Sequence, residues 1–186
     1  MSERSSNGSP VEIERVFLLR GLPPLPATAE AHRLEQGYLE PATSRAGEVT
    51  HGGDGFSEGR LRRWTDPDGR VTCFHTIKRG HGIVRQEIER TIPEVEFAAS
   101  WPRTGSRRIE KTRYRVPHDD LVWEIDRFDR PPLVLAEVEL PALHHPVAIP
   151  DWLDGWIVRE ISEDPRYRNS ELARRLASDE PLPPLA

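Results

Sequence analysis

Hydrophobic and polar residues alternate with a period of two along most of this chain, which is typical of β-strands. The clearest example is 121–140, LVWEIDRFDRPPLVLAEVEL, where two strand-like runs flank an Asp-Arg-Pro-Pro turn. Similar runs occupy 11–19, 32–40, 60–65, 70–79, 83–92 and 107–116. Only 93–101 and 169–176 have the spacing of helices, with 151–156 as a further turn or short helix. The pattern predicts a mainly β (α+β) fold of about eight strands with a few helices.

Charged residues recur at i and i+2 on many of these runs, so each pair shares one face of its strand. Like charges in this arrangement repel one another and are usually offered to cations, either a metal or opposing Lys and Arg. The acidic pairs are Glu12 with Glu14, Glu124 with Asp126, and Glu137 with Glu139; the basic pairs are Arg60 with Arg62 and Lys111 with Arg113, and Lys78, Arg85, Glu87 and Glu89 lie between them. One pair alone is most simply a solvated surface. Several pairs of opposite sign predict a closed barrel whose lumen has cationic and anionic sectors, with the apolar faces packed outward.

Length and composition narrow the classes of protein. The 186 residues suit one domain with a sizeable core, and we expect it to span 10–178 between tails at 1–9 and 179–186. The segment 41–59 has few apolar residues and is expected to be a long loop. A net charge of −5 argues against a nucleic-acid or membrane surface. With a single cysteine and no segment resembling a signal peptide, a cytoplasmic protein is expected.

Several other residues have a simple structural interpretation. Cys73 is expected to be a packing residue, and the five tryptophans to pack on the outside of the barrel. Glu87 and Glu89 could orient Lys78 and Arg85. Asn169 or the serine after it is available as the N-cap of the last helix.

A series of short motifs occurs in a characteristic order. They are EIER followed by FLL near the start, EQGYL at 35–39, RLR at 60–62, TIK at 76–78, RQEIE at 85–89, KTRY at 111–114, WEID at 123–126, AEVEL at 136–140 and DPRYRNSELA at 164–173. Over 11–177 the chain thereby resembles the CYTH superfamily, also called triphosphate tunnel metalloenzymes.

The resemblance implies an antiparallel eight-stranded barrel that binds a triphosphate and Mg²⁺ or Mn²⁺ in its tunnel. It assigns metal binding to Glu12, Glu14, Asp126, Glu137 and Glu139. It assigns substrate binding to Arg60, Arg62, Lys78, Arg85, Lys111 and Arg113, and catalytic roles to Glu12, Glu14, Lys78 and Arg113. These residue types suit the roles, because hard divalent cations prefer carboxylate oxygens whereas Arg and Lys recognise phosphate.

The chain departs from the family pattern at two positions. Val16 replaces the lysine of the family's ExExK signature, and Glu35 replaces a frequent arginine. Arg15 cannot take the place of that lysine, because it points to the opposite face of an unbulged strand. A missing cation should weaken phosphate binding or the stabilisation of the leaving phosphate.

The function that we expect is metal-dependent hydrolysis of inorganic tripolyphosphate or a related triphosphate. Its partner would be that small molecule, with no nucleic acid or membrane, and the protein would be a monomer or homodimer. The alternatives within the family are a class IV-type adenylyl cyclase and a thiamine triphosphatase. From another class, a binder of polyphosphate or nucleotide could have lost turnover through Val16. A lipocalin-like barrel is disfavoured because the inferred lumen is charged.

Overall fold

The computed structural model describes residues 11–39, 59–79 and 84–184. The strands are β1 (Val11–Leu19), β2 (Glu30–Leu39), β3 (Gly59–Thr65), β4 (Val71–Arg79), β5 (Val84–Ile92), β6 (Arg108–His118), β7 (Leu121–Phe128), β8 (Val134–Glu139) and β9 (Ile157–Glu160). The helices are α1 (Glu94–Ser100), α2 (Asp151–Asp154) and α3 (Asn169–Ala177), with 3-10 turns η1 (Trp101–Thr104) and η2 (Pro165–Tyr167).

The described strands form one antiparallel sheet of nine, in the order β5-β4-β3-β2-β6-β7-β8-β1-β9. The predicted mainly antiparallel β fold with few helices is therefore confirmed. β1 pairs with three strands: Val11–Ile13 with β5, Glu14–Leu19 with β8, and Phe17–Leu19 with β9. Sequence analysis missed β9, whose four residues are too few for alternation to be recognised. It extends the sheet beside the end of β1.

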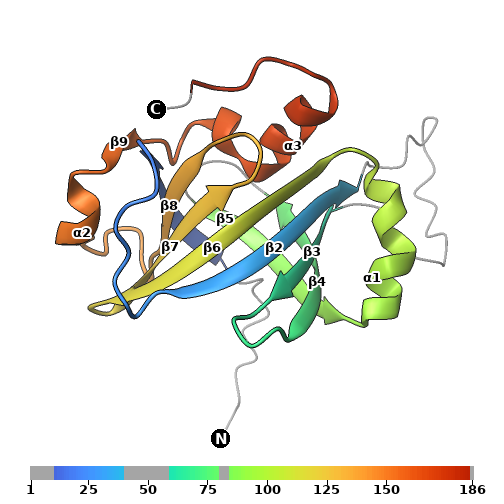
Figure 1. The fold of residues 1–186 in the computed structure, drawn as a ribbon, viewed down its shortest axis with the longest axis horizontal. Helices are drawn as coiled ribbons and strands as arrows, with labels where there is room; N and C mark the ends of the chain where they lie inside the picture. The colour runs from blue at the N-terminus through green and yellow to red at the C-terminus, as the bar shows by residue number, and fades with distance from the viewer. Residues whose placement is uncertain (1–10, 40–58, 80–83, 185–186) are drawn as a thin grey trace, which may run out of the picture.

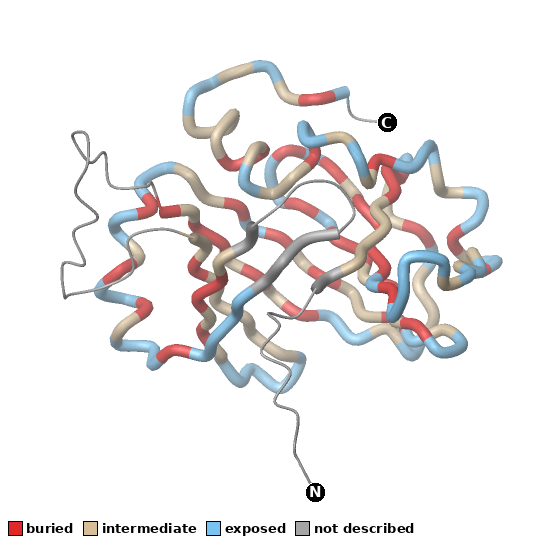
Figure 2. Tube along the Cα trace, turned by 180° about the vertical axis from the view of Figure 1, so that it is seen from behind, coloured by how far each residue is buried: buried red, intermediate tan, exposed pale blue. Residues whose placement is uncertain are grey.

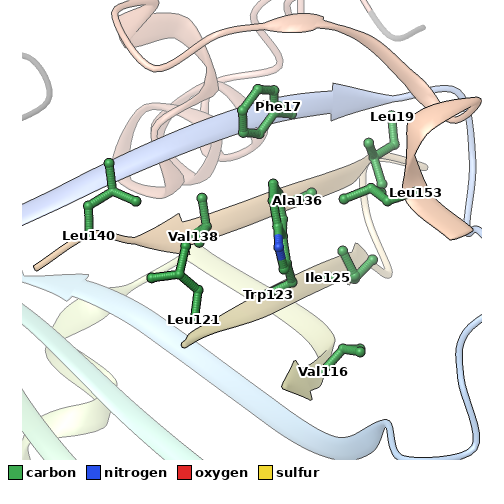
Figure 3. Close-up of a cluster of buried hydrophobic side chains, with 10 residues drawn as sticks. All are labelled: Phe17, Leu19, Val116, Leu121, Trp123, Ile125, Ala136, Val138, Leu140 and Leu153. Carbon is green, nitrogen blue, oxygen red and sulfur yellow. The ribbon is translucent and has the colours of Figure 1, made fainter. Parts of the chain in front are cut away.

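The largest hydrophobic core covers the outer face of β1, β6, β7 and β8. Figure 3 shows the side chains of Phe17 and Leu19 from β1 beside Trp123 and Ile125 from β7, with Leu153 of α2 next to them. Trp123 and Ile125 alternate along β7 with Glu124 and Asp126. Burying the apolar members therefore turns the carboxylates to the inner face of the sheet.

Two further clusters lie under the remaining helices. Under α1, Phe97 packs on Leu39, Leu61, Cys73 and Ile92 of the sheet, so the interpretation of Cys73 as a packing residue is confirmed.

The last helix, α3, packs on a third hydrophobic cluster. Leu172 and Ala173 of α3 pack with Leu18, Ile109 and other residues at the inner side of the strands. In Figure 1, α1 and α2 lie at opposite ends of the sheet and α3 lies along one side. Viewed from behind in Figure 2, buried residues follow the strands, and exposed ones gather in the turns.

Several boundaries differ from the sequence prediction. The chain does not leave the helical conformation before Pro102, because α1 continues directly into η1 (Trp101–Thr104), where proline is tolerated in the first turn. The strand expected from residue 32 begins at Glu30. The segment 179–184, expected as a tail, contacts the body: Tyr167 donates a hydrogen bond to the Pro184 carbonyl at 2.5 Å. None of the described helices is long and apolar enough to span a membrane.

We predict that Gly37→Ala destabilises the fold, because a Cβ at this position would lie 2.7 Å from Thr104 Cγ2 of η1. Thr104 cannot easily move, since its hydroxyl donates to the Trp101 carbonyl and accepts from Arg108 Nε, both at 2.8 Å. The free energy of unfolding in urea should fall by about 1–3 kcal/mol, the usual cost of overpacking.

Gly155→Ala is the matched control for this prediction. Nothing lies within 4 Å of a Cβ built at Gly155, and its φ of −67° suits alanine. Its stability should equal or slightly exceed that of the wild type. Equal stabilities of the two variants would contradict the crowding at Gly37.

Candidate functional site

The inner faces of the strands and the start of α3 surround a cavity of about 620 Å³. Many of its lining side chains are charged, and the signs are segregated by strand. The basic ones on β3 and β6 are Arg60, Arg62, Lys111, Arg113 and Arg115, and the acidic ones on β1, β7 and β8 include Glu14, Glu124, Glu137 and Glu139. Cationic side chains therefore lie on one wall of the cavity and carboxylates on another.

The acidic wall brings like charges into direct register. Glu14 of β1 is paired with Glu139 of β8, and Glu124 of β7 is paired with Glu137. Carboxylates that face one another across adjacent strands repel, so this wall attracts cations. Its donors are all oxygens, which suits Mg²⁺ or Mn²⁺.

A buried guanidinium ties the acidic wall to the basic one. Arg113 on β6 donates from Nε to Asp126 Oδ1 at 2.7 Å and from Nη2 to Asp126 Oδ2 at 2.6 Å. The same side chain also contacts Glu124 and Glu137. The Arg113 side chain is 10% exposed and Asp126 is fully buried, so this is a buried ion network whose desolvation cost must be met by these contacts.

Lys111 shares the same carboxylate. Its ammonium contacts Asp126 Oδ2, and Asn169 Oδ1 of α3 lies 3.5 Å away. Burial lowers the pKa of Lys111, whereas the Asp126 charge opposes that shift. Burial disfavours the Asp126 carboxylate as well, but Arg113 and Lys111 outweigh this effect and lower its pKa to about 2. Asp126 is therefore ionised and holds two cations in place.

Glu137 has the opposite shift. Burial and the nearby Asp126 charge raise the pKa of Glu137 to about 7, although Arg113 and Lys111 act to lower it. Glu14 adds a further repulsive charge from across the strand pair. Burial is the larger cause of this shift, and the neighbouring carboxylates add to it.

The arginines of β3 are held by a different carboxylate. Arg62 Nη2 donates to both oxygens of Glu89, at 2.8 and 2.9 Å, and Arg60 Nη2 lies 3.3 Å from the same group. Thr76 donates to Glu89 at 2.6 Å. Glu89 thus contacts these β3 and β4 side chains. The side chains of Lys78 and Arg85, which the sequence suggested it could orient, lie outside the described residues.

Not every predicted residue can be placed in the cavity. The side chains of Glu12, Lys78 and Arg85 lie outside the described residues, although the backbone register pairs Glu12 with Arg85 on β5. Asp126 is not among the cavity-lining residues, because it lies beneath Lys111 and Arg113. Within the described part of the chain, no three His, Cys, Asp or Glu side chains are grouped closely enough to hold a metal ion.

The strand face assigned to Val16 and Arg15 agrees with the structure. Val16 lines the cavity and lies opposite Glu137, whereas Arg15 forms an ion pair with Glu160 at 2.6 Å and does not line it. Glu35, the other departure, points away from the cavity and lies 3.4 Å from Arg63.

Sequence reasoning missed several lining residues. Trp64 was expected to pack outside, but it lines the cavity and donates to His32 Nδ1 at 2.9 Å. The alternation that identified Arg62 also places Trp64 on the same face, so this signal was present. Arg168 and Asn169 gave no such signal, because they belong to the start of a helix that the tertiary fold brings to the cavity.

Comparison of the sequence with models of known protein families gives no match. The chain is 36% identical to the inorganic triphosphatase of Nitrosomonas europaea over 168 residues, which cover 87% of this chain and 96% of that protein. It is 37% identical to the inorganic triphosphatase of Acetivibrio thermocellus over 123 residues, which cover 59% of this chain and 73% of that one.

A solved structure extends the comparison to the fold. The crystal structure of an inorganic triphosphatase aligns with a TM-score of 0.54 and 32% identity, over 87% of this chain and 97% of the other. This identity and this coverage are close to those found for the Nitrosomonas europaea protein. The chain therefore belongs to the inorganic triphosphatase family.

Proposed function

We propose that this protein hydrolyses inorganic tripolyphosphate or a related triphosphate within the charged cavity. The observation that carries the proposal is the segregation of charge: arginines and a lysine on β3 and β6 face a cavity whose β1 and β8 wall carries carboxylates. Phosphate binds to the first set and a divalent cation to the second. Membership of the inorganic triphosphatase family supports this assignment.

The basic side chains would bind the phosphates. Arg60, Arg62 and Lys111 would position the polyanion, and Arg113 would stabilise charge that develops during transfer. Glu89 and Asp126 hold these cations at defined positions, so we assign to Asp126 a positioning role in place of metal binding. Lys78 and Arg85 would contribute from β4 and β5, as their places in the strands suggest.

The acidic side chains would hold the metal. Glu14, Glu137 and Glu139 suit a hard cation by donor type and lie on the paired strands β1 and β8, and Glu12 of β1 would be a further ligand. Because no three such side chains of the described residues are grouped closely enough for a metal ion, these carboxylates would have to move together to hold it. When bound, Mg²⁺ or Mn²⁺ neutralises phosphate charge and acidifies water. Glu12 and Glu14 would orient the attacking water, and we assign no protein group as general base.

The finer fold assignment belongs to the same proposal. We infer that strands β1–β8 form the eight-stranded tunnel of the CYTH superfamily. β1 would close this barrel by pairing with β5 on one side and β8 on the other. The pairing of β1 with both β5 and β8 supports this inference. A tunnel would keep bulk water from competing for the phosphate contacts.

The direct test is phosphate release from tripolyphosphate by the purified protein with Mg²⁺, with Mn²⁺ and with EDTA. We expect metal-dependent release that EDTA abolishes, with ATP and thiamine triphosphate assayed in parallel to rank substrates. Binding of tripolyphosphate by calorimetry without release from any substrate would contradict hydrolysis and favour the non-catalytic binding module.

A pair of arginine variants tests the location of the site. Arg62 lines the cavity, whereas its neighbour Arg63 points to the other face and pairs with Glu35 and Glu94. Arg62→Ala should raise KM for tripolyphosphate by roughly ten- to a hundred-fold, the effect of losing one charged phosphate contact. Arg63→Ala should leave KM within about threefold of the wild type, and equal KM values for both would place the substrate elsewhere.

The raised pKa of Glu137 predicts how the stability of the metal-free protein depends on pH. Between its ordinary pKa of 4.5 and about 7, Glu137 keeps its proton in the folded protein and has lost it in the unfolded chain. The free energy of unfolding should therefore fall as pH rises through this window, by up to about 3 kcal/mol from this group.

Glu137→Gln should remove this part of the pH dependence, which unfolding in urea between pH 4.5 and 8 would measure. The exposed Glu163→Gln serves as the control and should follow the wild type. A Glu137→Gln profile parallel to that of the wild type would contradict the raised pKa.

A further inference from the structure

The residue before α3 is an arginine that takes no part in stabilising the helix. Arg168 occupies the N-cap position, and its side chain makes no capping hydrogen bond. This position favours Ser, Thr, Asp or Asn, and a cation near a helix N-terminus opposes the helix dipole. Arg168 is thus a poor choice for the helix, which indicates that another requirement fixes it.

The Arg168 side chain lines the cavity and is half-buried. Among the described residues no hydrogen bond or ion pair is recorded for its guanidinium. The neighbouring basic side chains differ in this respect: Arg166 donates to Asp164 at 2.9 and 2.7 Å, and Arg159 donates to Tyr167 at 2.8 Å. Arg168 therefore presents an unused positive charge to the cavity.

Contacts on both sides fix where this charge lies. Upstream, the Ile161 amide donates to the Val16 carbonyl at 2.8 Å, and the Val16 amide donates to Ser162 Oγ at 2.9 Å. Downstream, Asn169 Oδ1 lies 3.5 Å from Lys111 Nζ. The segment that carries Arg168 therefore runs along the cavity from Val16 on β1 to Lys111 on β6.

Val16 contributes no charge to the cavity wall formed by β1 and β8. It faces the cavity opposite Glu137, between the carboxylate positions of β1 and β8, and it is apolar. A triphosphate drawn to this end would find carboxylates from two strands and no cation from β1. Beside a metal ion on these carboxylates, a positive side chain would bind the phosphate directly, and Arg168 reaches the cavity from the adjoining segment.

We propose that Arg168 binds a phosphate group of the substrate and supplies the positive charge that Val16 does not. The proposal rests on the proposed triphosphatase function and names a further substrate-binding residue for it. The guanidinium would donate two hydrogen bonds to phosphate oxygens, as Arg does where planar recognition is needed.

The test is steady-state kinetics with tripolyphosphate and Mg²⁺ on wild type and four variants. Arg168→Ala should raise KM by roughly ten- to a hundred-fold, and Arg168→Lys by a smaller factor. The control Arg166→Ala removes a cation two residues away that does not line the cavity, and should stay within about threefold. In Val16→Lys/Arg168→Ala, a lysine from β1 should restore much of the loss, which a merely structural role of Arg168 would not allow.

Thermal unfolding of each variant checks that the fold is retained. A KM of Arg168→Ala within threefold of that of Arg166→Ala overturns the proposal while leaving the hydrolysis by wild type intact. If wild type releases no phosphate from tripolyphosphate, the proposed function fails, and the role of Arg168 fails with it.

Discussion

The buried ion network around Arg113 is the interaction on which the site depends. One guanidinium contacts Glu124, Asp126 and Glu137, and so joins β6 to β7 and β8 across the inner face. Removing these charges from water is costly and is offset only by their mutual contacts. The network therefore fixes the relative positions of the basic and acidic walls, and loss of one member would leave an unpaired buried charge.

The outer packing and the inner charges are two results of the same alternation. Trp123 and Ile125 are buried on one side of β7, and this places Glu124 and Asp126 on the other. A hydrophobic interior on both faces would leave no cavity, because close-packed cores exclude space for a ligand. Instead, α1 and α2 cover outer faces, α3 packs on an apolar part of the inner face, and the rest of the inner face keeps its charges (Figure 1).

The strand faces could be predicted from sequence because side-chain direction in a strand is a local property. How deeply a side chain is buried, and which distant segments contact one another, could not be predicted in this way. Alternation put Asp126 on the inner face, but only the structure shows it beneath Lys111 and Arg113. Likewise, helical spacing predicted α3 and suggested Asn169 as its cap. Its contact with Lys111, and the place of Arg168 in the cavity, depend on how the helix packs.

The most direct measurement is a crystal structure with Mn²⁺ and a tripolyphosphate analogue whose bridging oxygens are replaced by NH, with anomalous scattering to locate the manganese. The account predicts manganese at Glu14, Glu137 and Glu139 and phosphates against the β3 and β6 cations in the same cavity. An analogue bound outside this cavity, or manganese bound away from the β1 and β8 carboxylates, would contradict it.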